Sequence, residues 1–410
     1  MRRVVVTGCG IVSPVGIGVD SFWEAIISGK SGIARITQFN PDKFDSQIAG
    51  EVKGFDPASI LSYKEIKRTA RFVQFALFSA KEAISESNLD FNKEDPFRVG
   101  VVIGSGIGSL EAIEKEHKVL LEKGPRRISP FLIPMLITNE AAGVVAITFG
   151  LKGPNFCTVT ACASGAHAVG EAYRIIQQDK ADIMLCGGAE AAITPMGVGG
   201  FCALKALSKR NDDPQHASRP FDKDRDGFIM AEGSGIIVLE ELEHAKKRGA
   251  HIYCELAGYS ATCDAYHITA PDPEGETPAM AMRQALKEAG AEGNNIYVNA
   301  HGTSTQLNDK METRAMKRAF GSIAKDISIS STKSMTGHTL GAAGAIEFIV
   351  CCLAIKNKII PPTMNLDSPD PECDLDYTPN KAKEANIKIA MSNSLGFGGH
   401  NASLVIKEFK

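Results

Sequence analysis

Short apolar runs alternate with longer amphipathic segments along nearly the whole chain, and this alternation constrains the fold more than any other feature. Runs rich in Val and Ile, such as Val4–Thr7 and Val99–Ile103, are typical of buried strands. Segments with helical periodicity, such as Thr69–Ser87 and Thr277–Ala289, lie between such runs. Because strands that alternate with helices indicate an α/β protein, we predict an α/β fold.

The same pattern continues to the end of the chain. Further strands are predicted at Ile183–Cys186, Gly235–Leu239, Ile296–Ala300, Ile327–Ser330, Ile387–Met391 and Ala402–Ile406, and further helices at Asp20–Ser28, Ala163–Gln178 and Asp309–Phe320.

The length of 410 residues exceeds the usual size of a single hydrophobic core. We therefore expect two α/β halves, residues 1–250 and 251–410, joined near the charged run Glu240–Arg248, which is interpreted as a helix or a loop. A weak internal similarity supports this division. Thr160–Gly165 and Gly337–Ala342 both follow a predicted strand and form a turn of small residues that opens a buried helix.

Composition excludes several classes of function. The 45 Lys and Arg residues are outnumbered by 48 Asp and Glu residues, so the chain lacks the basic excess of a nucleic-acid-binding protein. The apolar stretch Leu340–Ile355 is short for a membrane span and contains Glu347, which favours a buried helix. The ten cysteines form no C-x-x-C pair and no targeting segment precedes Val4, so we expect a cytoplasmic location, or an organelle if a presequence has been removed.

Two segments, one rich in glycine and one rich in aspartate, resemble ligand-binding motifs only in part. Gly8-Cys9-Gly10 follows a strand, but Ser13 stands where a dinucleotide-binding fingerprint has its third glycine. The segment Asp222–Gly227 begins like a calcium-binding loop, but the required glutamate at position twelve is Gly233. We therefore interpret the second segment as a turn held by its own aspartate side chains.

The strongest local signal is Thr158–Gly165, in which a strand runs into small residues and then into a helix. Cys162 lies near the predicted helix N-terminus, where unpaired N–H groups and the helix dipole lower the pKa of a thiol. Two interpretations remain open at this point, a reactive nucleophile and a buried, inert cysteine.

Two histidines favour the reactive interpretation. His301 lies in Asn299–Thr305 and His338 in Lys333–His338, and each follows a predicted strand. Ligands bind at the carboxyl ends of strands in open α/β sheets. The spacing around His301 is not that of a zinc site. Glu347 is the only charged residue of Leu340–Ile355 and requires a partner, which Lys333 or a bound cation could supply.

Together these segments resemble the β-ketoacyl-[acyl-carrier-protein] synthases, which are condensing enzymes of the thiolase superfamily. The resemblance extends from Val4 to Ile406 and includes the Cys162 turn, Asn299–Thr305, Lys333–His338 and the ending Asn393–Gly399. It implies a duplicated thiolase fold, with five α-β-α-β-α layers and two mixed sheets, and a homodimer.

Within this family the chain is most similar to the elongating enzymes, because Ile107 in Gly104–Ile107 and Phe201 in Gly200–Phe201 match their acyl pocket. The initiating enzymes have a Cys-His-Asn set, whereas the second partner here is His338. A degradative thiolase has a second catalytic cysteine near its C-terminus, and this chain has none there. The chain departs from many bacterial relatives at His400, where they have Thr.

The resemblance implies fatty-acid elongation by a decarboxylative Claisen condensation between malonyl-carrier and an acyl-enzyme, without a redox or organic cofactor. Cys162 would be the nucleophile, His301 and His338 would stabilise the enolate, Lys333 would set their electrostatics, and Phe397 would gate access to the sulfur. The backbone N–H groups of Cys162 and Phe397 would form the oxyanion hole.

Three further sets of residues are expected from the resemblance. Substrate-binding residues would be Ile107, Phe201, Thr303, Thr305 and Gly398. An acidic acyl carrier protein would dock on Lys64, Lys67, Arg68, Arg126, Arg127 and Lys205. A monovalent cation would be held by Asn299, Ala300, Glu347, Ser392 and Asn393.

Three functions other than fatty-acid elongation share part of this pattern. A polyketide ketosynthase would use the same catalytic residues on different chains. A non-catalytic chain-length-factor-like subunit would lack the nucleophile, and Cys162 is present. A Cys–His hydrolase would orient one histidine with Asn or Asp rather than combine two histidines with a lysine.

Overall fold

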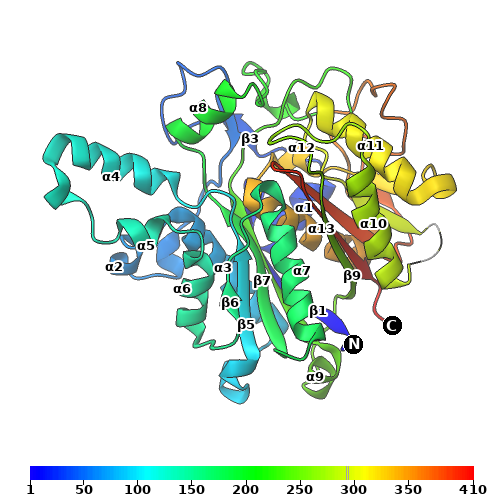
Figure 1. The fold of residues 1–410 in the computed structure, drawn as a ribbon, viewed down its shortest axis with the longest axis horizontal. Coiled ribbons are helices and arrows are strands. Elements are labelled where there is room, and N and C mark those ends of the chain that lie inside the picture. The colour runs from blue at the N-terminus through cyan, green and yellow to red at the C-terminus, as the bar shows by residue number, and fades with distance from the viewer. Residues whose placement is uncertain (292, 294) are drawn as a thin grey trace.

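Most of the strands form one large mixed sheet in the computed structural model, which describes residues 1–410 apart from 292 and 294 (Figure 1). The sheet has eleven strands in the order β11-β10-β14-β15-β9-β1-β8-β7-β5-β6, with β2 paired to β1. The bounds are β1 Val4–Ser13, β2 Gly16–Ile17, β5 Val99–Gly104, β6 Asn155–Phe156, β7 Ile183–Glu190, β8 Gly233–Glu241, β9 Cys254–Cys263, β10 Ile296–Asn299, β11 Ser328–Ser330, β14 Ile389–Gly396 and β15 His400–Lys407. Two small antiparallel sheets pair β3 (Ile33–Arg35) with β4 (Ile48–Gly50) and β12 (Ile359–Ile360) with β13 (Lys383–Glu384).

The two halves of the sheet repeat one pairing pattern. In the first half β5 is parallel to β6 and β7, β7 is antiparallel to β8, and β8 is antiparallel to β1. In the second half β10 is parallel to β11 and β14, β14 is antiparallel to β15, and β15 is antiparallel to β9. The prediction of an α/β fold with mixed sheets is confirmed. The two expected sheets are nevertheless connected, because Val4–Val6 of β1 pair with Cys254–Leu256 of β9.

Helices pack on both faces of each half. Helices α3 (Arg71–Ser87) and α6 (Glu140–Phe149) contact the first half, and α10 (Glu276–Ala289) contacts β9 and β15 of the second half and packs against α11 (Gln306–Phe320). Helices α7 (Ser164–Gln177) and α13 (Ala343–Asn357) lie between the halves and touch strands of both. The remaining helices are α1 (Val19–Ile27), α2 (Tyr63–Ile66), α4 (Leu110–Lys123), α5 (Leu132–Leu136), α8 (Pro195–Ala203), α9 (Leu242–Lys247) and α12 (Lys333–Thr336).

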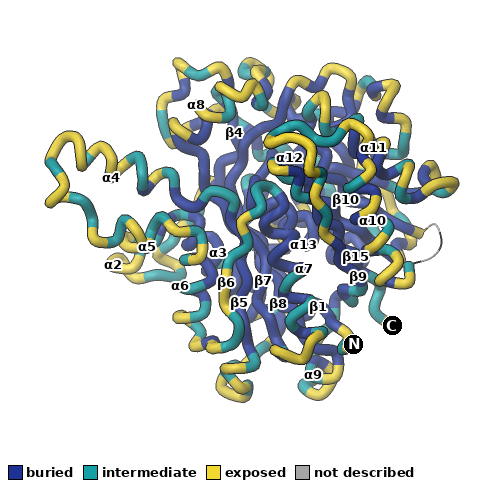
Figure 2. The backbone as a smooth tube through the Cα atoms, in the orientation of Figure 1, coloured by how far each residue is buried: buried dark blue, intermediate teal, exposed yellow. Residues whose placement is uncertain are grey.

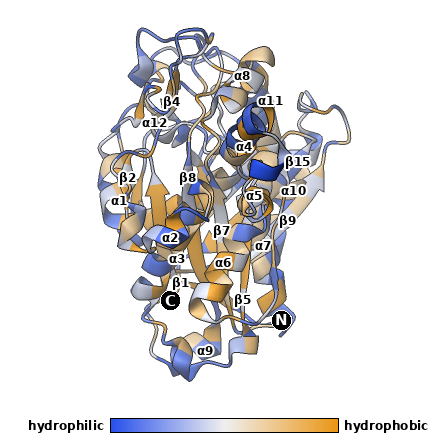
Figure 3. Ribbon diagram, turned by 90° about the vertical axis from the view of Figure 1, so that its left-hand side faces the viewer, coloured by the Kyte–Doolittle hydropathy of each residue, from blue (hydrophilic) through white to orange (hydrophobic). Residues whose placement is uncertain are grey.

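The apolar stretch around Glu347 is buried inside the protein, as predicted. One helical stretch, Leu340–Asn357, is long and apolar enough to cross a membrane, but 89% of it is buried. Figure 2 shows α13 in the interior of the molecule. Figure 3 shows hydrophobic strands at the centre and hydrophilic segments such as α9 at the surface. The apolar character of this stretch therefore reflects its position between the two halves.

All of the predicted strands and helices are present, with ends that differ by a few residues, and Glu240–Arg248 contains helix α9. Strand β9 was missed because Glu255 and Gly258 interrupt its apolar run. Helix α4 was missed because it has almost no apolar face. Ala112 is its one buried residue. The interpretation of Asp222–Gly227 as a turn held by an aspartate side chain is confirmed. The Asp222 carboxylate accepts hydrogen bonds from the N–H groups of Asp224, Asp367 and Ser368.

The internal duplication is visible in the turns before the two inner helices. The segments Thr160–Ala166 and Thr339–Ala345 share the pattern Thr-x-x-Ala-x-Gly-Ala. In each, the short 3₁₀ turn begins at a non-glycine residue with positive φ, Ala161 at 51° and Leu340 at 50°. This register corrects the sequence-based match, which paired Thr160 with Gly337. It places Cys162 and Gly341 at equivalent positions in the two halves.

Candidate active site

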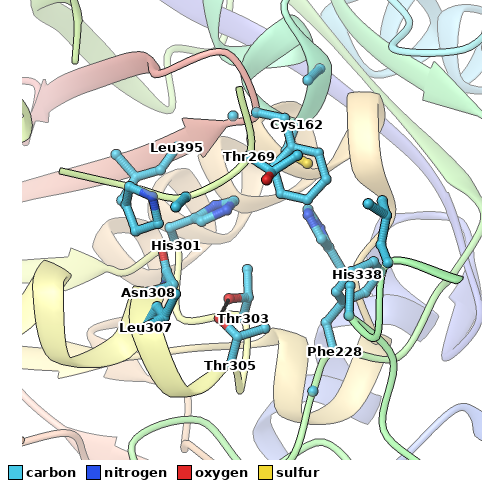
Figure 4. A pocket seen from close by; sticks show the side chains of 18 of the residues that line it. Cys162, Phe228, Thr269, His301, Thr303, Thr305, Leu307, Asn308, His338 and Leu395 are labelled. Carbon is cyan, nitrogen blue, oxygen red and sulfur yellow. Dashed lines mark hydrogen bonds between the residues drawn. The ribbon is translucent and has the colours of Figure 1, made fainter. Parts of the chain in front are cut away.

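A cavity of about 490 Å³ collects the predicted catalytic side chains at one place (Figure 4). Cys162 comes from the 3₁₀ turn before α7, and His301 follows the end of β10. His338 lies between α12 and α13, and Phe397 lies in the turn between β14 and β15. All four line the cavity, and they come from both halves of the sheet. The predicted residues that also line it are Ile107, Phe201, Thr303, Thr305 and Lys205.

The two imidazoles face each other nearly at right angles across the cavity. Their ring centroids are 5.3 Å apart, with an interplanar angle of 85°. Burial lowers the pKa of both rings well below its usual value, and the charge of Lys333 lowers it further. Both histidines are therefore neutral at physiological pH. A neutral imidazole carries one N–H donor and one acceptor nitrogen.

His338 is buried, yet neither of its ring nitrogens has a hydrogen-bond partner among the described residues. Its ring is held by contact with the edge of Phe228, whose centroid is 5.4 Å away. Buried polar atoms in native proteins are almost always paired. The two free nitrogens of His338 are therefore available to a bound substrate.

Lys333 and Glu347 form a buried ion pair behind His301. The Lys333 ammonium donates to Oε1 of Glu347, and its Nζ lies 3.5 Å from Nδ1 of His301. Burial raises the pKa of Glu347 to about 7, against the opposing effect of Lys333. Both side chains are at most 3% exposed. Lys333 is thus a fixed positive charge beside the neutral imidazole of His301.

Cys162 is partly exposed toward the cavity, which excludes the interpretation as a fully buried cysteine. Burial raises the pKa of its thiol to about 12, although Lys333 acts in the opposite direction. The net shift of this pKa is therefore upward, opposite to the direction expected from the position of Cys162 near a helix N-terminus. Desolvation of the thiolate outweighs the opposing charge of Lys333.

The sequence did not identify Glu312, which holds the backbone that carries His301. Its carboxylate is fully buried and accepts hydrogen bonds from the N–H groups of His301, at 2.7 Å, and Gly302, at 2.8 Å. Burial raises the pKa of Glu312 to about 7. Glu312 lies in α11, whose amphipathic pattern was recognised. A carboxylate at a buried helical position was the available signal.

The turn containing Phe397 lies directly against Cys162. A Cβ atom at Gly396 would be 3.3 Å from the backbone nitrogen of Cys162. The N–H of Gly398, at φ +86°, donates to the Ile268 carbonyl at 2.8 Å. Gly396, Phe397 and Gly399 line the cavity, and Gly398 lies between them in the same turn, so its role in binding substrate stays a prediction.

The predicted docking residues are all exposed, but they do not form one group with the cavity. Lys64 lies in α2, and Lys67 and Arg68 follow this helix. The Arg68 guanidinium carbon lies 4.4 Å from the ring centroid of Phe131. Arg126 and Arg127 follow α4, in the part of the molecule that projects from the body in Figure 1. Of this set, Lys205 is the residue that lines the cavity.

Several residues predicted to hold a cation carry buried oxygens without a hydrogen-bond partner among the described residues. Buried oxygens without partners among the described residues include Oδ1 of Asn299, Oε2 of Glu347 and Oγ of Ser392. Asn299 and Ser392 lie opposite each other on β10 and β14. In the described part of the chain, no group of three or more His, Cys, Asp or Glu side chains is arranged to hold a metal. Oxygen ligands with one carboxylate suit a hard cation.

Comparison with known proteins agrees with this geometry. Residues 1–245 match the family model "Beta-ketoacyl synthase, N-terminal domain", and residues 253–367 match "Beta-ketoacyl synthase, C-terminal domain". The chain is 52% identical over 410 residues to 3-oxoacyl-[acyl-carrier-protein] synthase 2 of Synechocystis sp., covering 100% of this chain and 99% of that protein.

Two solved structures are similar over their full length and that of this chain. A β-ketoacyl synthase from Burkholderia phymatum has a TM-score of 0.92 at 36% identity. A ketosynthase bound to a hexaketide, solved with the acyl carrier protein of a type II polyketide synthase, has a TM-score of 0.92 at 40% identity. Both matches cover 100% of each chain.

Proposed function

The chain belongs to the β-ketoacyl synthase family, and we propose that Cys162, His301 and His338 carry out its reaction. It has the α/β ketosynthase fold with a large mixed sheet. Its activity is the condensing step of fatty-acid elongation, in which an acyl-enzyme thioester is extended by malonyl-acyl carrier protein with loss of CO₂. The residue roles are supported by one observation, which is that Cys162 and the two neutral histidines line the same cavity.

In the first half-reaction the sulfur of Cys162 attacks the thioester of an acyl-carrier. A new thioester forms on Cys162, the bond to the carrier thiol breaks, and the thiol proton passes overall to the departing carrier. The tetrahedral intermediate carries an oxyanion, which the N–H groups of Cys162 and Phe397 stabilise. In other enzymes, loss of one such donor slows catalysis by about 10²–10³-fold.

In the second half-reaction malonyl-carrier loses CO₂ and leaves an enolate. His301 and His338 each donate one hydrogen bond to the enolate oxygen, a role supported by their neutral state and by the unpaired nitrogens of His338. The enolate carbon attacks the acyl thioester, the carbon–sulfur bond to Cys162 breaks, and the released thiolate takes up a proton from solvent to restore the thiol. The product is 3-oxoacyl-carrier, two carbons longer than the acyl group that entered.

Lys333 keeps His301 in its neutral form, because a positive charge 3.5 Å from the ring opposes protonation. Asn299, the Ala300 carbonyl, Glu347, Ser392 and Asn393 would hold a monovalent cation. This assignment is supported by Asn299 Oδ1, Glu347 Oε2 and Ser392 Oγ, which are buried and have no partner among the residues described. A bound cation would supply positive charge to compensate the second oxygen of Glu347.

Ile107 and Phe201 line the acyl part of the cavity. Thr303 and Thr305, whose hydroxyls lie 2.9 Å apart, hydrogen-bond the pantetheine arm. Phe397 controls access to the sulfur from a turn flanked by glycines.

The acidic carrier docks on Lys64, Lys67, Arg68, Arg126, Arg127 and Lys205, a proposal supported by the exposure of all six side chains. In the related ketosynthase complex the partner is an acyl carrier protein.

The repeated pairing pattern supports two thiolase-like halves, residues 1–250 with Cys162 and residues 251–410 with His301 and His338. The inner helices α7 and α13, with outer helices beyond each half, support a five-layer arrangement. The exposed edge strand β6 supports a homodimer, because an unpaired sheet edge can pair with a second copy of the chain. The ten cysteines are all free, which suits a reducing compartment such as a bacterial cytoplasm.

The experiment is intact-protein mass spectrometry after mixing with acyl carrier proteins charged from hexanoyl to octadecanoyl, on wild type and Cys162→Ala. We expect an acyl adduct on the wild type and none on the variant. The acylation rate should fall as salt is raised, because the carrier is steered by charge. No adduct on a folded wild-type protein with any chain would contradict the assignment of Cys162. Preference for poly-β-keto chains over saturated ones would instead favour the polyketide alternative, which the 40% identical ketosynthase raises.

A further inference from the structure

Glu190 is a fully buried carboxylate that the mechanism above does not use. It ends strand β7, and it has no ion-pair partner in the part of the chain that the structure describes. Burying an unpaired carboxylate is costly unless hydrogen bonds compensate it. Four donors provide this compensation, and they come from two separate turns of the chain.

The first turn forms part of the acyl cavity. Glu190 accepts hydrogen bonds from the Ser105 hydroxyl at 3.0 Å, the Gly106 N–H at 2.8 Å and the Ile107 N–H at 3.3 Å. Gly106 and Ile107 both line the cavity. A Cβ atom at Gly106 would lie 3.2 Å from the Ala161 carbonyl, so this turn also lies against the turn that carries Cys162.

The second turn follows His338. The Gly341 N–H donates to Oε2 of Glu190 at 3.1 Å, the same oxygen that accepts from Gly106. Leu340, between His338 and Gly341, lines the cavity and has a strained positive φ of 50°. There is no room for a side chain at Gly341, because a Cβ there would lie 2.3 Å from the Gly106 nitrogen and 2.6 Å from Oε2 of Glu190.

One carboxylate therefore joins the wall of the acyl cavity to the backbone that presents His338. We propose that Glu190 is a positioning residue that couples the position of Ile107 to that of His338, so that the acyl chain affects how well the enolate is bound. This inference rests on the roles proposed for Cys162 and His338. It deepens them by assigning a residue that relates chain length to the condensation step.

The substitution Glu190→Gln tests the coupling with little change of shape. An amide keeps one acceptor oxygen, so it can hold the Gly106–Gly341 pair or the Ser105–Ile107 pair but not both. We expect Cys162 to be acylated at nearly the wild-type rate. We expect condensation to slow by about 10- to 100-fold, as for a misplaced catalytic group, and its dependence on acyl chain length to flatten.

Glu240→Gln is the matched control. Glu240 is also fully buried in a strand, but it pairs with Arg248 and His244 at the opposite end of β8 from the cavity. The readouts are the ratio of acylation to condensation rate and the ratio of rates between short and long chains. A purely structural loss would lower both half-reactions together and leave these ratios unchanged, as we expect for Glu240→Gln.

Ser105→Ala provides a second variant that removes one donor and keeps the carboxylate. We expect the same direction of change as in Glu190→Gln, with a smaller size. Unchanged ratios in both variants, beside a normal adduct on wild-type Cys162, would overturn the Glu190 proposal alone. Absence of the wild-type adduct would overturn the assignment of Cys162 and the coupling with it.

Discussion

Burial has a larger effect than neighbouring charge on the protonation of the side chains around the cavity. The pKa of the Cys162 thiol is raised to about 12, although Lys333 opposes this shift. The pKa values of His301 and His338 are lowered, so both remain neutral hydrogen-bond donors. Without substrate the protein therefore holds a thiol and two neutral imidazoles rather than a thiolate–imidazolium pair.

This protonation state predicts how Cys162 reacts with an alkylating agent at different pH values. Because the thiol pKa is raised, the thiolate fraction should rise about tenfold per pH unit from neutral pH upward, and the alkylation rate should follow it. Peptide mass spectrometry after timed iodoacetamide pulses would measure the rate at Cys162, with Cys162→Ser as the control. A rate that reaches a plateau near neutral pH would contradict the raised pKa.

The cation assignment gives a second prediction for individual residues. Crystals grown with rubidium should show an anomalous peak between Asn299 Oδ1, Glu347 Oε2 and Ser392 Oγ, three of the buried oxygens without partners among the described residues. The substitution Ser392→Ala, which removes one ligand, should weaken that peak. Density that fits only a water molecule would contradict the assignment.

At the scale of elements, the two inner helices depend on small residues where they cross. Gly344 of α13 has no room for a side chain, because a Cβ there would lie 2.6 Å from the Ser394 hydroxyl and 2.7 Å from the Cβ of Ala166 in α7. Gly165 approaches the Gly341 carbonyl in the same way. This crossing sets the distance between the turn of Cys162 and the turn that follows His338.

We expect Gly344→Ala to lower the free energy of unfolding by about 1–3 kcal/mol, the usual cost of overpacking a core. Gly143→Ala in α6 is the matched control, since a Cβ atom at Gly143 would have no neighbour within 4 Å. It should raise stability by up to about 1 kcal/mol, because alanine favours helix over glycine. Urea unfolding of both variants measures the difference, and equal stabilities would contradict the tight crossing.

At the scale of the whole molecule, the sheet ends at an exposed edge. Strand β6 is the outermost strand beside β5, and Phe156, Val159 and Ile147 near this edge are 39%, 53% and 81% exposed. An edge strand with apolar neighbours is a template for pairing with another chain. A second copy related by a two-fold axis would cover the edge in both subunits at once.

We therefore expect a native mass of twice the 43.8 kDa chain mass, measured by light scattering after gel filtration. The double substitution Ile147→Lys and Val159→Lys should shift the mass toward that of one chain, because it places two like charges in the interface. Met280→Lys is the control, because Met280 is 38% exposed on α10, which packs on β9 and β15 of the other half of the sheet. A double variant that keeps the wild-type mass would contradict this interface.

Local sequence was enough to predict the α/β class, most strands and helices, and Cys162, His301 and His338 as candidate site residues. Strand runs such as Val99–Ile103, the small-residue turn at Cys162 and the turn at His338 are all encoded by residues adjacent in the chain. The resemblance to a family then assigned roles to these motifs. The comparisons confirm the family and its activity, whereas the roles of individual residues remain predictions.

Features that depend on distant segments were decided only by the tertiary structure. Strand β9 pairs with both β1 and β15, and this pairing joins the two sheets that were expected to be separate. Glu312 and Glu190 accept hydrogen bonds from N–H groups on other turns, and these partners are brought to them only by the folding of the chain. The raised pKa of Cys162 has the same origin, because desolvation depends on everything packed around the sulfur. Sequence specifies short-range geometry, whereas burial and long-range hydrogen bonds exist only once the chain is folded.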